Sequence, residues 1–385
     1  MRFGYIAIEK GKGWFVPQKF SGIVEVDFSS GKSKFLSRLS GYSIFESNLC
    51  GAIQKKNNLL VTSLLYKEEL NLYRIKESES VKVILEKFTS RKEVDSKRGK
   101  FRMSFCKENY IYFIGCGYPG IIKIDTASEE IKIFDIEIEN GSQAKGNDNG
   151  ILGWSAGITD KKLYIPLCGR RELVVFDMEK EEYKIEKIRN SCYMAVSRNE
   201  QELYLFPEQN RVIENYDIDQ REWKRQIDFP KGFLGEEESR WYCAAFFHCG
   251  YMWIFPSKAN MVLRLEVEKE EFVCIEEFDN VEELKYLNAG VYDENKVWGF
   301  YQKENRLDII DCHSLQIQHK YISTPDNIGE FVRMEEDWES YVSQIHIEEE
   351  LDMKQMLSFI YDKDSLSAEH KIRKGTGSNI WEKIG

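Results

Sequence analysis

The feature that most constrains this chain of 385 residues is a degenerate repeat of short apolar segments separated by polar turns. One copy comprises an apolar run at 163–166, a polar turn, a second apolar run at 173–177 and a charged turn at 179–182. Short runs of this kind, with alternating polar positions, indicate β-strands. Each copy closes on a charged residue, and these closing positions recur every 40–52 residues: Asp27, Arg74, Asp125, Asp177, Asp217, Glu266 and Asp311.

A second set of positions keeps step with the first, ten or eleven residues before each closing residue: Pro17, Ser63, Gly115, Pro166, Pro207, Pro256 and Tyr301. A period near 45 residues with four short strands per copy is typical of a β-propeller blade. We therefore predict an all-β fold, a seven-bladed β-propeller of four-stranded antiparallel blades over residues 1–322. The predicted blades span residues 1–40, 41–88, 101–138, 151–188, 191–229, 240–279 and 285–322.

The acidic closing residues favour a structural role, because a carboxylate at the end of a strand accepts backbone N–H groups of the following turn. After residue 322 the pattern changes, and we predict a C-terminal appendage over residues 323–385. Apolar residues at helical spacing predict an amphipathic helix within 347–361. This helix either packs on the propeller or serves as a docking segment for a partner.

Composition limits the classes of partner. The formal net charge is −11, and the only dense basic stretch, residues 91–102, also contains acids. We therefore expect no nucleic-acid and no membrane partner. The nine cysteines show no paired spacing, and the sequence from Met1 enters a strand pattern without a cleavable apolar core. These features predict reduced thiols and a cytoplasmic location.

Two local motifs resemble known repeat families. Residues 216–223, with Tyr216 and Asp217 followed by Trp223, resemble the kelch repeat. The segments 210–212, 260–262 and 305–307 each place an asparagine before a closing acid, which looks like the repeats of bacterial YVTN-type propellers. The resemblance implies the propeller architecture, and no blade contains the paired glycine usual in kelch blades.

A propeller generally binds ligands at one mouth of its central channel, where the loops before the inner strands meet the loops between the second and third strands. In this chain those loops are rich in aromatic and charged residues, which suit stacking and directed hydrogen bonds. The tryptophans could equally fill the channel. The ligand-binding candidates are Phe45, Arg102, Tyr118, Trp154, Arg170, Arg171, Tyr193, Arg240, Trp241 and Tyr286.

Catalytic signatures are lacking in the sequence. None of the five histidines forms a metal-binding or catalytic motif, so we expect no metal and no cofactor. The weak catalytic candidates are Glu46, Glu208 and Glu238 on mouth loops, and His248 at the end of an inner strand.

Two hypotheses follow. The first is a recognition module that binds a peptide, a carbohydrate or a protein partner at the mouth. The alternative is a lyase, hydrolase or epimerase acting on a sugar or modified peptide through carboxylates in the same place.

Overall fold

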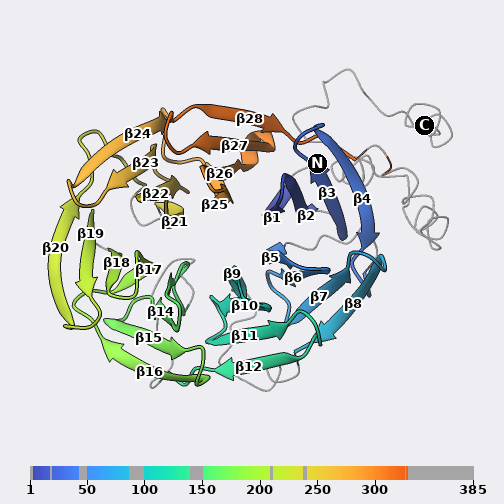
Figure 1. The fold of residues 1–385 in the computed structure, drawn as a ribbon, viewed down its shortest axis with the longest axis horizontal. Coiled ribbons are helices and arrows are strands. Elements are labelled where there is room, and N and C mark those ends of the chain that lie inside the picture. The colour runs from blue at the N-terminus through green and yellow to red at the C-terminus, as the bar shows by residue number, and fades with distance from the viewer. Residues whose placement is uncertain are drawn as a thin grey trace, which may run out of the picture.

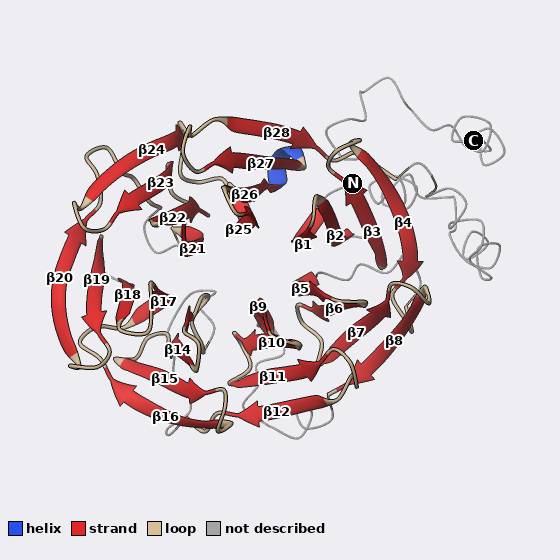
Figure 2. Cartoon of the chain, in the orientation of Figure 1, coloured by secondary structure: helices blue, strands red, loops and turns tan. Residues whose placement is uncertain are grey.

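The computed structural model describes residues 3–17, 20–42, 50–85, 99–138, 151–208, 211–236, 241–325 and 327. Its strands form seven four-stranded antiparallel sheets around a central axis, so the predicted seven-bladed β-propeller is confirmed (Figure 1). The amphipathic helix predicted within 347–361 of the C-terminal appendage lies outside the described residues and stays a prediction. Among the described residues the only helical element is the short 3-10 helix η1 (Gln302–Glu304), drawn blue in Figure 2. No helix in these ranges is long and apolar enough to cross a bilayer.

The first four blades follow one another along the chain. Their strands are β1 (Phe3–Glu9), β2 (Lys12–Pro17), β3 (Gly22–Asp27) and β4 (Lys32–Arg38) in blade 1; β5 (Cys50–Lys56), β6 (Leu59–Leu64), β7 (Glu69–Arg74) and β8 (Glu79–Ile84) in blade 2; β9 (Phe101–Lys107), β10 (Tyr110–Gly115), β11 (Gly120–Asp125) and β12 (Ile131–Asp135) in blade 3; and β13 (Gly157–Ile158), β14 (Lys162–Pro166), β15 (Glu172–Asp177) and β16 (Glu182–Lys187) in blade 4.

The last three blades complete the ring. Their strands are β17 (Cys192–Ser197), β18 (Glu202–Pro207), β19 (Val212–Asp217) and β20 (Glu222–Asp228) in blade 5; β21 (Tyr242–His248), β22 (Tyr251–Pro256), β23 (Met261–Glu266) and β24 (Glu271–Glu277) in blade 6; and β25 (Tyr286–Asp293), β26 (Lys296–Tyr301), β27 (Arg306–Asp311) and β28 (Ile317–Tyr321) in blade 7.

Every closing position of the sequence repeat is the last residue of the third strand of its blade. The five aspartates among them accept turn N–H groups as predicted. The carboxylate of Asp27, for example, accepts from the backbone of Ser29 and Ser30. These hydrogen bonds lower the pKa of each of the five aspartates. The repeat of the sequence is therefore a repeat of strand ends and turns.

The hydrophobic core is divided among the blades. Seven clusters of buried apolar side chains each join two neighbouring blades, and the cluster between blades 7 and 1 closes the ring. The middle two strands of each blade supply most of this packing; β6, for instance, is buried at all six positions. Outer strands such as β16 are largely exposed, because only one edge and one face of them meet protein.

Ring closure does not exchange a strand between the ends of the chain. All of blade 1 comes from the N-terminal segment and all of blade 7 from residues 286–321. Instead, the segment after β28 lies along β4. The amide of Asn327 accepts from the Phe35 backbone N–H at 2.9 Å and donates to the Phe35 carbonyl at 3.0 Å, while the Ser33 hydroxyl donates to the Ser323 carbonyl.

Blade 4 departs from the regular pattern at its inner strand. Only Gly157–Ile158 pair as β13, whereas the inner strands of the other six blades have six to eight residues. The preceding residues bend toward blade 5. There Ser155 forms a parallel bridge with Met194, and the backbone N–H of Trp154 donates to the Tyr193 carbonyl at 2.8 Å. This bend brings Trp154 to the rim of the channel beside blade 5.

Candidate functional site

The strand order fixes which loops meet. In each antiparallel blade, the loop that leads into the inner strand and the loop between the second and third strands lie at one end of the channel, which we call the mouth. The remaining two turns of each blade lie at the opposite end, which we call the underside. Contacts between neighbouring mouth loops agree with this, since the carboxylate of Glu208 in blade 5 accepts from the Gly169 N–H of blade 4 at 2.9 Å.

The best-ordered feature of the mouth is a stacked pair of side chains from blades 3 and 4. Arg102, near the start of β9, places its guanidinium carbon 3.8 Å from the centre of the Trp154 ring, a cation–π contact. Trp154 is only 8% exposed, so the indole is a floor under the arginine and not an open platform. At Gly99 an added Cβ would lie 3.0 Å from the Arg102 Nε, so glycine there leaves room for the guanidinium.

Arg102 has a buried N–H group that lacks an acceptor among the described residues. Its Nε is buried and has no hydrogen-bond partner among the described residues, and it has no ion-pair partner there either. A buried N–H group is normally satisfied, because leaving it without an acceptor costs about 1–3 kcal/mol. The stacked arginine therefore holds an unused donor at the channel mouth.

A second arginine and tryptophan pair lies on blades 5 and 6. The guanidinium of Arg211 is 5.6 Å from the Trp241 ring centre, and the Trp241 indole N–H donates to the Glu236 carbonyl at 2.9 Å. Glu236 also binds Lys258 through a 2.5 Å ion pair. The pair thus sits on a braced loop, with Arg211 itself exposed to solvent.

Between these pairs lie the other mouth candidates. Tyr193 is 7% exposed and packs edge-on against Phe206. Arg170 is engaged by Glu172 at 2.6 Å, whereas Arg171 is exposed and has no ion pair with any described residue. Sequence reasoning treated the two arginines alike, but the structure separates a paired one from a solvent-facing one.

Charge is unevenly distributed around this mouth. Arg102, Arg171 and Arg211 belong to blades 3, 4 and 5 in succession, and none of them pairs with a carboxylate in the described ranges. On the underside, Arg74 and Arg198 bind two carboxylates each, and at the mouth of blade 7 Arg306 is paired as well. In a protein with net charge −11, blades 3, 4 and 5 therefore each contribute to the mouth one arginine that has no ion pair with any described residue.

Two aromatic candidates are packing residues. Tyr118 is fully buried, packs against Phe101 and donates its hydroxyl to Asp135. Tyr286 is also fully buried, and its hydroxyl binds both Glu276 and Asp308. The sequence places both near mouth loops but does not show how deeply the side chains lie, so we assign neither to ligand binding.

Other candidates fall elsewhere. Phe45, Glu46, Glu238 and Arg240 lie outside the described residues, so the proposed grouping of Glu46, Glu208 and Glu238 remains a prediction. His248 ends β21 on the underside, at the other end of the channel from the mouth.

Arg211 was missed by sequence reasoning. The segment 210–212 was interpreted as part of the repeat, which hid the arginine at its centre. The signal that could have found it is its position in a mouth loop, immediately before the third strand.

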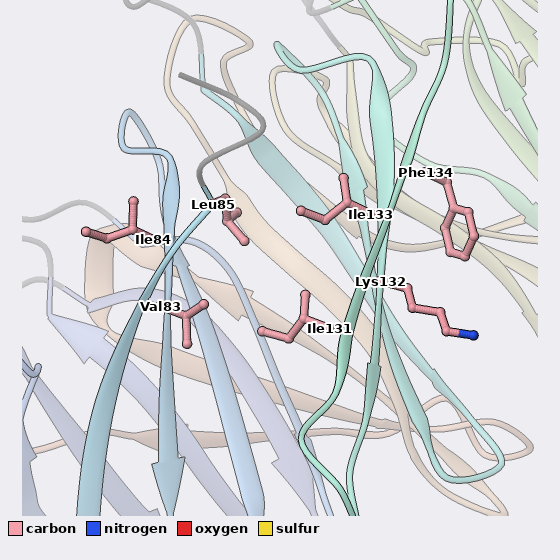
Figure 3. Close-up of a pocket in the computed structure, with 7 residues that line it drawn as sticks. All are labelled: Val83, Ile84, Leu85, Ile131, Lys132, Ile133 and Phe134. Atoms are coloured by element: carbon pink, nitrogen blue, oxygen red, sulfur yellow. The ribbon is translucent and has the colours of Figure 1, made fainter. Parts of the chain in front are cut away.

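A recess on the outer rim is separate from the mouth. It has a volume of about 490 Å³ and lies between β8 of blade 2 and β12 of blade 3. Figure 3 shows Val83 and Leu85 pointing toward Ile131 and Ile133 across it, whereas Ile84 points away. The facing residues continue the apolar packing between the two blades, so the recess is the outer end of that interface.

Comparison with known proteins supports the fold alone. No protein-family model matches this sequence, and no curated protein matches it. Among solved structures, virginiamycin B lyase from Staphylococcus aureus superposes with a TM-score of 0.56 at 13% identity, covering 78% of this chain and 92% of that one. PorZ of Porphyromonas gingivalis gives a TM-score of 0.54 at 11% identity, covering 84% of this chain and 38% of that one. This chain shares the propeller architecture of these bacterial proteins.

Proposed function

We propose that this propeller is a recognition module whose mouth binds a negatively charged peptide, glycan or protein partner. The observation that carries the proposal is Arg102, whose guanidinium is fixed on Trp154 while its buried Nε–H has no acceptor among the described residues. A planar guanidinium held in place loses little further entropy on binding, and its donors match a carboxylate or another oxyanion.

The charge around Arg102 supports an anionic ligand. Arg171 and Arg211 add positive charge on the next two blades, and neither has an ion pair with a described residue. Such a field concentrates an anionic partner at the mouth and raises its association rate at low salt. Trp154, which is 8% exposed, supports this role by holding the Arg102 guanidinium in place and not by contacting the ligand.

A mutational test follows from this arrangement. Peptide and glycan arrays would first identify an acidic ligand for the unmodified protein, and calorimetric titration would then measure its dissociation constant. We expect Arg102→Ala and Arg211→Ala each to weaken binding by more than about 1 kcal/mol, or about fivefold. The double variant Arg170→Ala/Arg171→Ala should also weaken it, mainly through the exposed Arg171.

Arg221→Ala is the matched control. Arg221 lies on an underside turn of blade 5, its side chain is 67% exposed, and the substitution removes the same charge. Equal effects of Arg221→Ala and Arg102→Ala would show that only net charge matters, which would contradict a specific site at the mouth.

The enzymatic alternative makes a separate prediction. A lyase, hydrolase or epimerase needs an acid and a base that converge on the substrate, and Glu208 is the one described mouth candidate for such a role. Recovery of the array ligand unchanged after prolonged incubation would favour recognition. Conversion that stops in Glu208→Gln would favour catalysis.

We also propose a cytoplasmic location. All nine cysteines are free thiols, and five of them are buried. Reduced cysteines are typical of proteins that fold in a reducing compartment. Fractionation of cells producing the tagged protein tests this directly, and recovery outside the cytoplasm would contradict it.

A further inference from the structure

The underside brings together three side chains that the sequence keeps apart. His248 is the last residue of β21, Cys249 follows it in the turn to β22, and Cys312 comes directly after β27 in the next blade. One imidazole nitrogen and the two Sγ atoms lie within 4.8 Å of one another. The cluster therefore spans the boundary between blades 6 and 7.

The imidazole lacks the partner that a buried histidine normally has. The Nε2 of His248 is buried and makes no hydrogen bond with any described residue. A buried ring nitrogen without a partner costs free energy unless something else binds it. Its two neighbours in the cluster are thiol sulfurs, which are weak hydrogen-bond partners but strong metal ligands once deprotonated.

The two cysteines occupy different environments. Cys312 is fully buried, and burial next to Cys249 raises the pKa of its thiol to about 12. Cys249 is partly exposed and donates its thiol to the Glu294 carbonyl of blade 7 at 3.1 Å. One sulfur is thus held inside the interface while the other faces it from the turn, which leaves a path for an ion to enter from solvent.

The backbone aims Cys249 at the neighbouring blade. Cys249 and Gly250 both have positive φ, 51° and 82°, as in the two-residue turn of a tight hairpin. Glycine, asparagine and aspartate are the residues that such a turn favours. Lys10 and Glu108 occupy the same turn position in blades 1 and 3, so the turn itself does not select a cysteine in blade 6.

Packing explains the two cysteines in part and leaves His248 unexplained. In several other blades the residue after the third strand is apolar and packed, for example Phe28, Met178 and Val267, so Cys312 fits as a small core residue. Packing also accounts in part for Cys249, which contacts the apolar cluster between blades 6 and 7, but it gives no reason for an unsatisfied nitrogen on His248. The three side chains together match the donor set of a metal site.

A positively charged side chain, Arg264, lies next to the cluster and would stabilise thiolates. The Arg264 guanidinium donates to the Cys312 carbonyl at 2.9 Å and lies 4.1 Å from the Tyr251 ring centre. Its fixed positive charge next to Cys312 offsets the negative charge that two thiolates would add.

We propose that His248, Cys249 and Cys312 bind Zn²⁺ at the interface of blades 6 and 7, with a fourth position open to water. Zinc bonds of about 2.3 Å to sulfur and about 2.0 Å to nitrogen place ligand atoms roughly 3.5–3.8 Å apart in a tetrahedral site. Ligand atoms now within 4.8 Å reach that spacing by moving inward less than about 1 Å each. Binding would join two blades and release the thiol protons.

Cobalt titration of the purified full-length protein, reduced and freed of metal, tests the site. We expect Co²⁺ to bind one to one, giving a near-ultraviolet thiolate-to-cobalt charge-transfer band that stoichiometric Zn²⁺ abolishes. Cys249→Ser and His248→Gln should weaken cobalt binding about 100-fold or more, because even residues that only support ligands are worth 10–100-fold. Both positions border solvent, so we expect these two variants to fold. Cys312→Ser is a poorer test, because it places a hydroxyl at a fully buried position and is expected to destabilise the fold.

Cys274→Ser is the matched control, since Cys274 is an exposed free thiol on β24 of the same blade and should leave the titration unchanged. The proposal is overturned if the reduced protein gives no charge-transfer band, or if the band survives in Cys249→Ser. Mass spectrometry of alkylated protein tests the remaining alternative, a disulfide between Cys249 and Cys312. A Cys249–Cys312 disulfide that, once reduced, leaves a protein without cobalt affinity would assign the pair to redox bonding instead.

Discussion

Replacing Asp308 should destabilise the propeller more than any other single charge change at the blade 6 and blade 7 interface. The side chain of Asp308 is fully buried in β27. It accepts hydrogen bonds from Arg306 at 2.7 and 3.0 Å and from the Tyr286 hydroxyl at 2.7 Å, and it lies 2.5 Å from the Nδ1 of His319. The carboxylate is therefore the centre of a network that involves three partners.

The size of the effect follows from what remains after truncation. Asp308→Ala leaves the 9% exposed Arg306 with Glu304 at 2.7 Å and Glu276 at 3.4 Å, so its charge is still partly compensated. Breaking a buried pair costs about 3–5 kcal/mol when the surviving charge is left alone. Because Arg306 keeps two carboxylates, we expect the lower end, about 3 kcal/mol of unfolding free energy.

Urea unfolding at neutral pH, with the same denaturant slope in each variant, measures this loss. Glu304→Ala is the matched control, since it removes a carboxylate from the same Arg306 at a side chain that is 43% exposed, and it should cost less than about 1 kcal/mol. Asp308→Asn separates charge from packing: it should cost nearly as much as alanine if charge dominates. A loss for Asp308→Ala no larger than that for Glu304→Ala would refute the reasoning.

Two further predictions concern the turns and the ring closure. Turn N–H groups lower the pKa of Asp125 and Asp311, so their stabilisation is present above the unfolded pKa near 3.9 and is lost as pH falls through the lower folded value. Urea unfolding at pH 7 and pH 3 should therefore show a smaller acid-induced loss in the double Asp→Asn variant than in the unmodified protein, and an equal loss would count against this account. Asn327→Ala removes two hydrogen bonds to Phe35 and should lower stability by about 1 kcal/mol, with faster proteolysis after β28; unchanged stability would show that the apolar cluster between blades 7 and 1 closes the ring by itself.

The architecture was predictable because a propeller is built from contacts between neighbours. Each blade must bury the same strands and close with the same turns, so the sequence repeats its strand ends, and Asp177 and Pro166 mark the ends of β15 and β14. Blade 4 shows the limit of this reasoning. The pattern does not reveal that residues before Gly157 leave the sheet to bridge Met194 of blade 5.

The functional surfaces were only partly predictable, because they depend on radial depth and on contacts between blades. The sequence places Arg102 and Trp154 in loops of different blades, and their stacking arises only when the ring brings those loops together. Tyr286 occupies an equivalent loop position but points into the blade interface, where Asp308 binds it. The approach of Cys312 to Cys249 likewise requires two complete blades in register.

The two ends of the channel differ in their turns and in the pairing of their charged residues. Most underside turns are short and held by their own chemistry: aspartates bind turn N–H groups, and residues such as Lys10 and Glu108 adopt positive φ in tight hairpins. The mouth loops between the second and third strands hold Arg171 and Arg211, which have no carboxylate partners in the described ranges. Because the residues of the mouth loops differ from blade to blade, we expect a ligand site at the mouth. On the underside, the first position of the hairpin between the two inner strands accepts different residues, and in blade 6 it holds Cys249, which faces the buried Cys312 across the blade boundary.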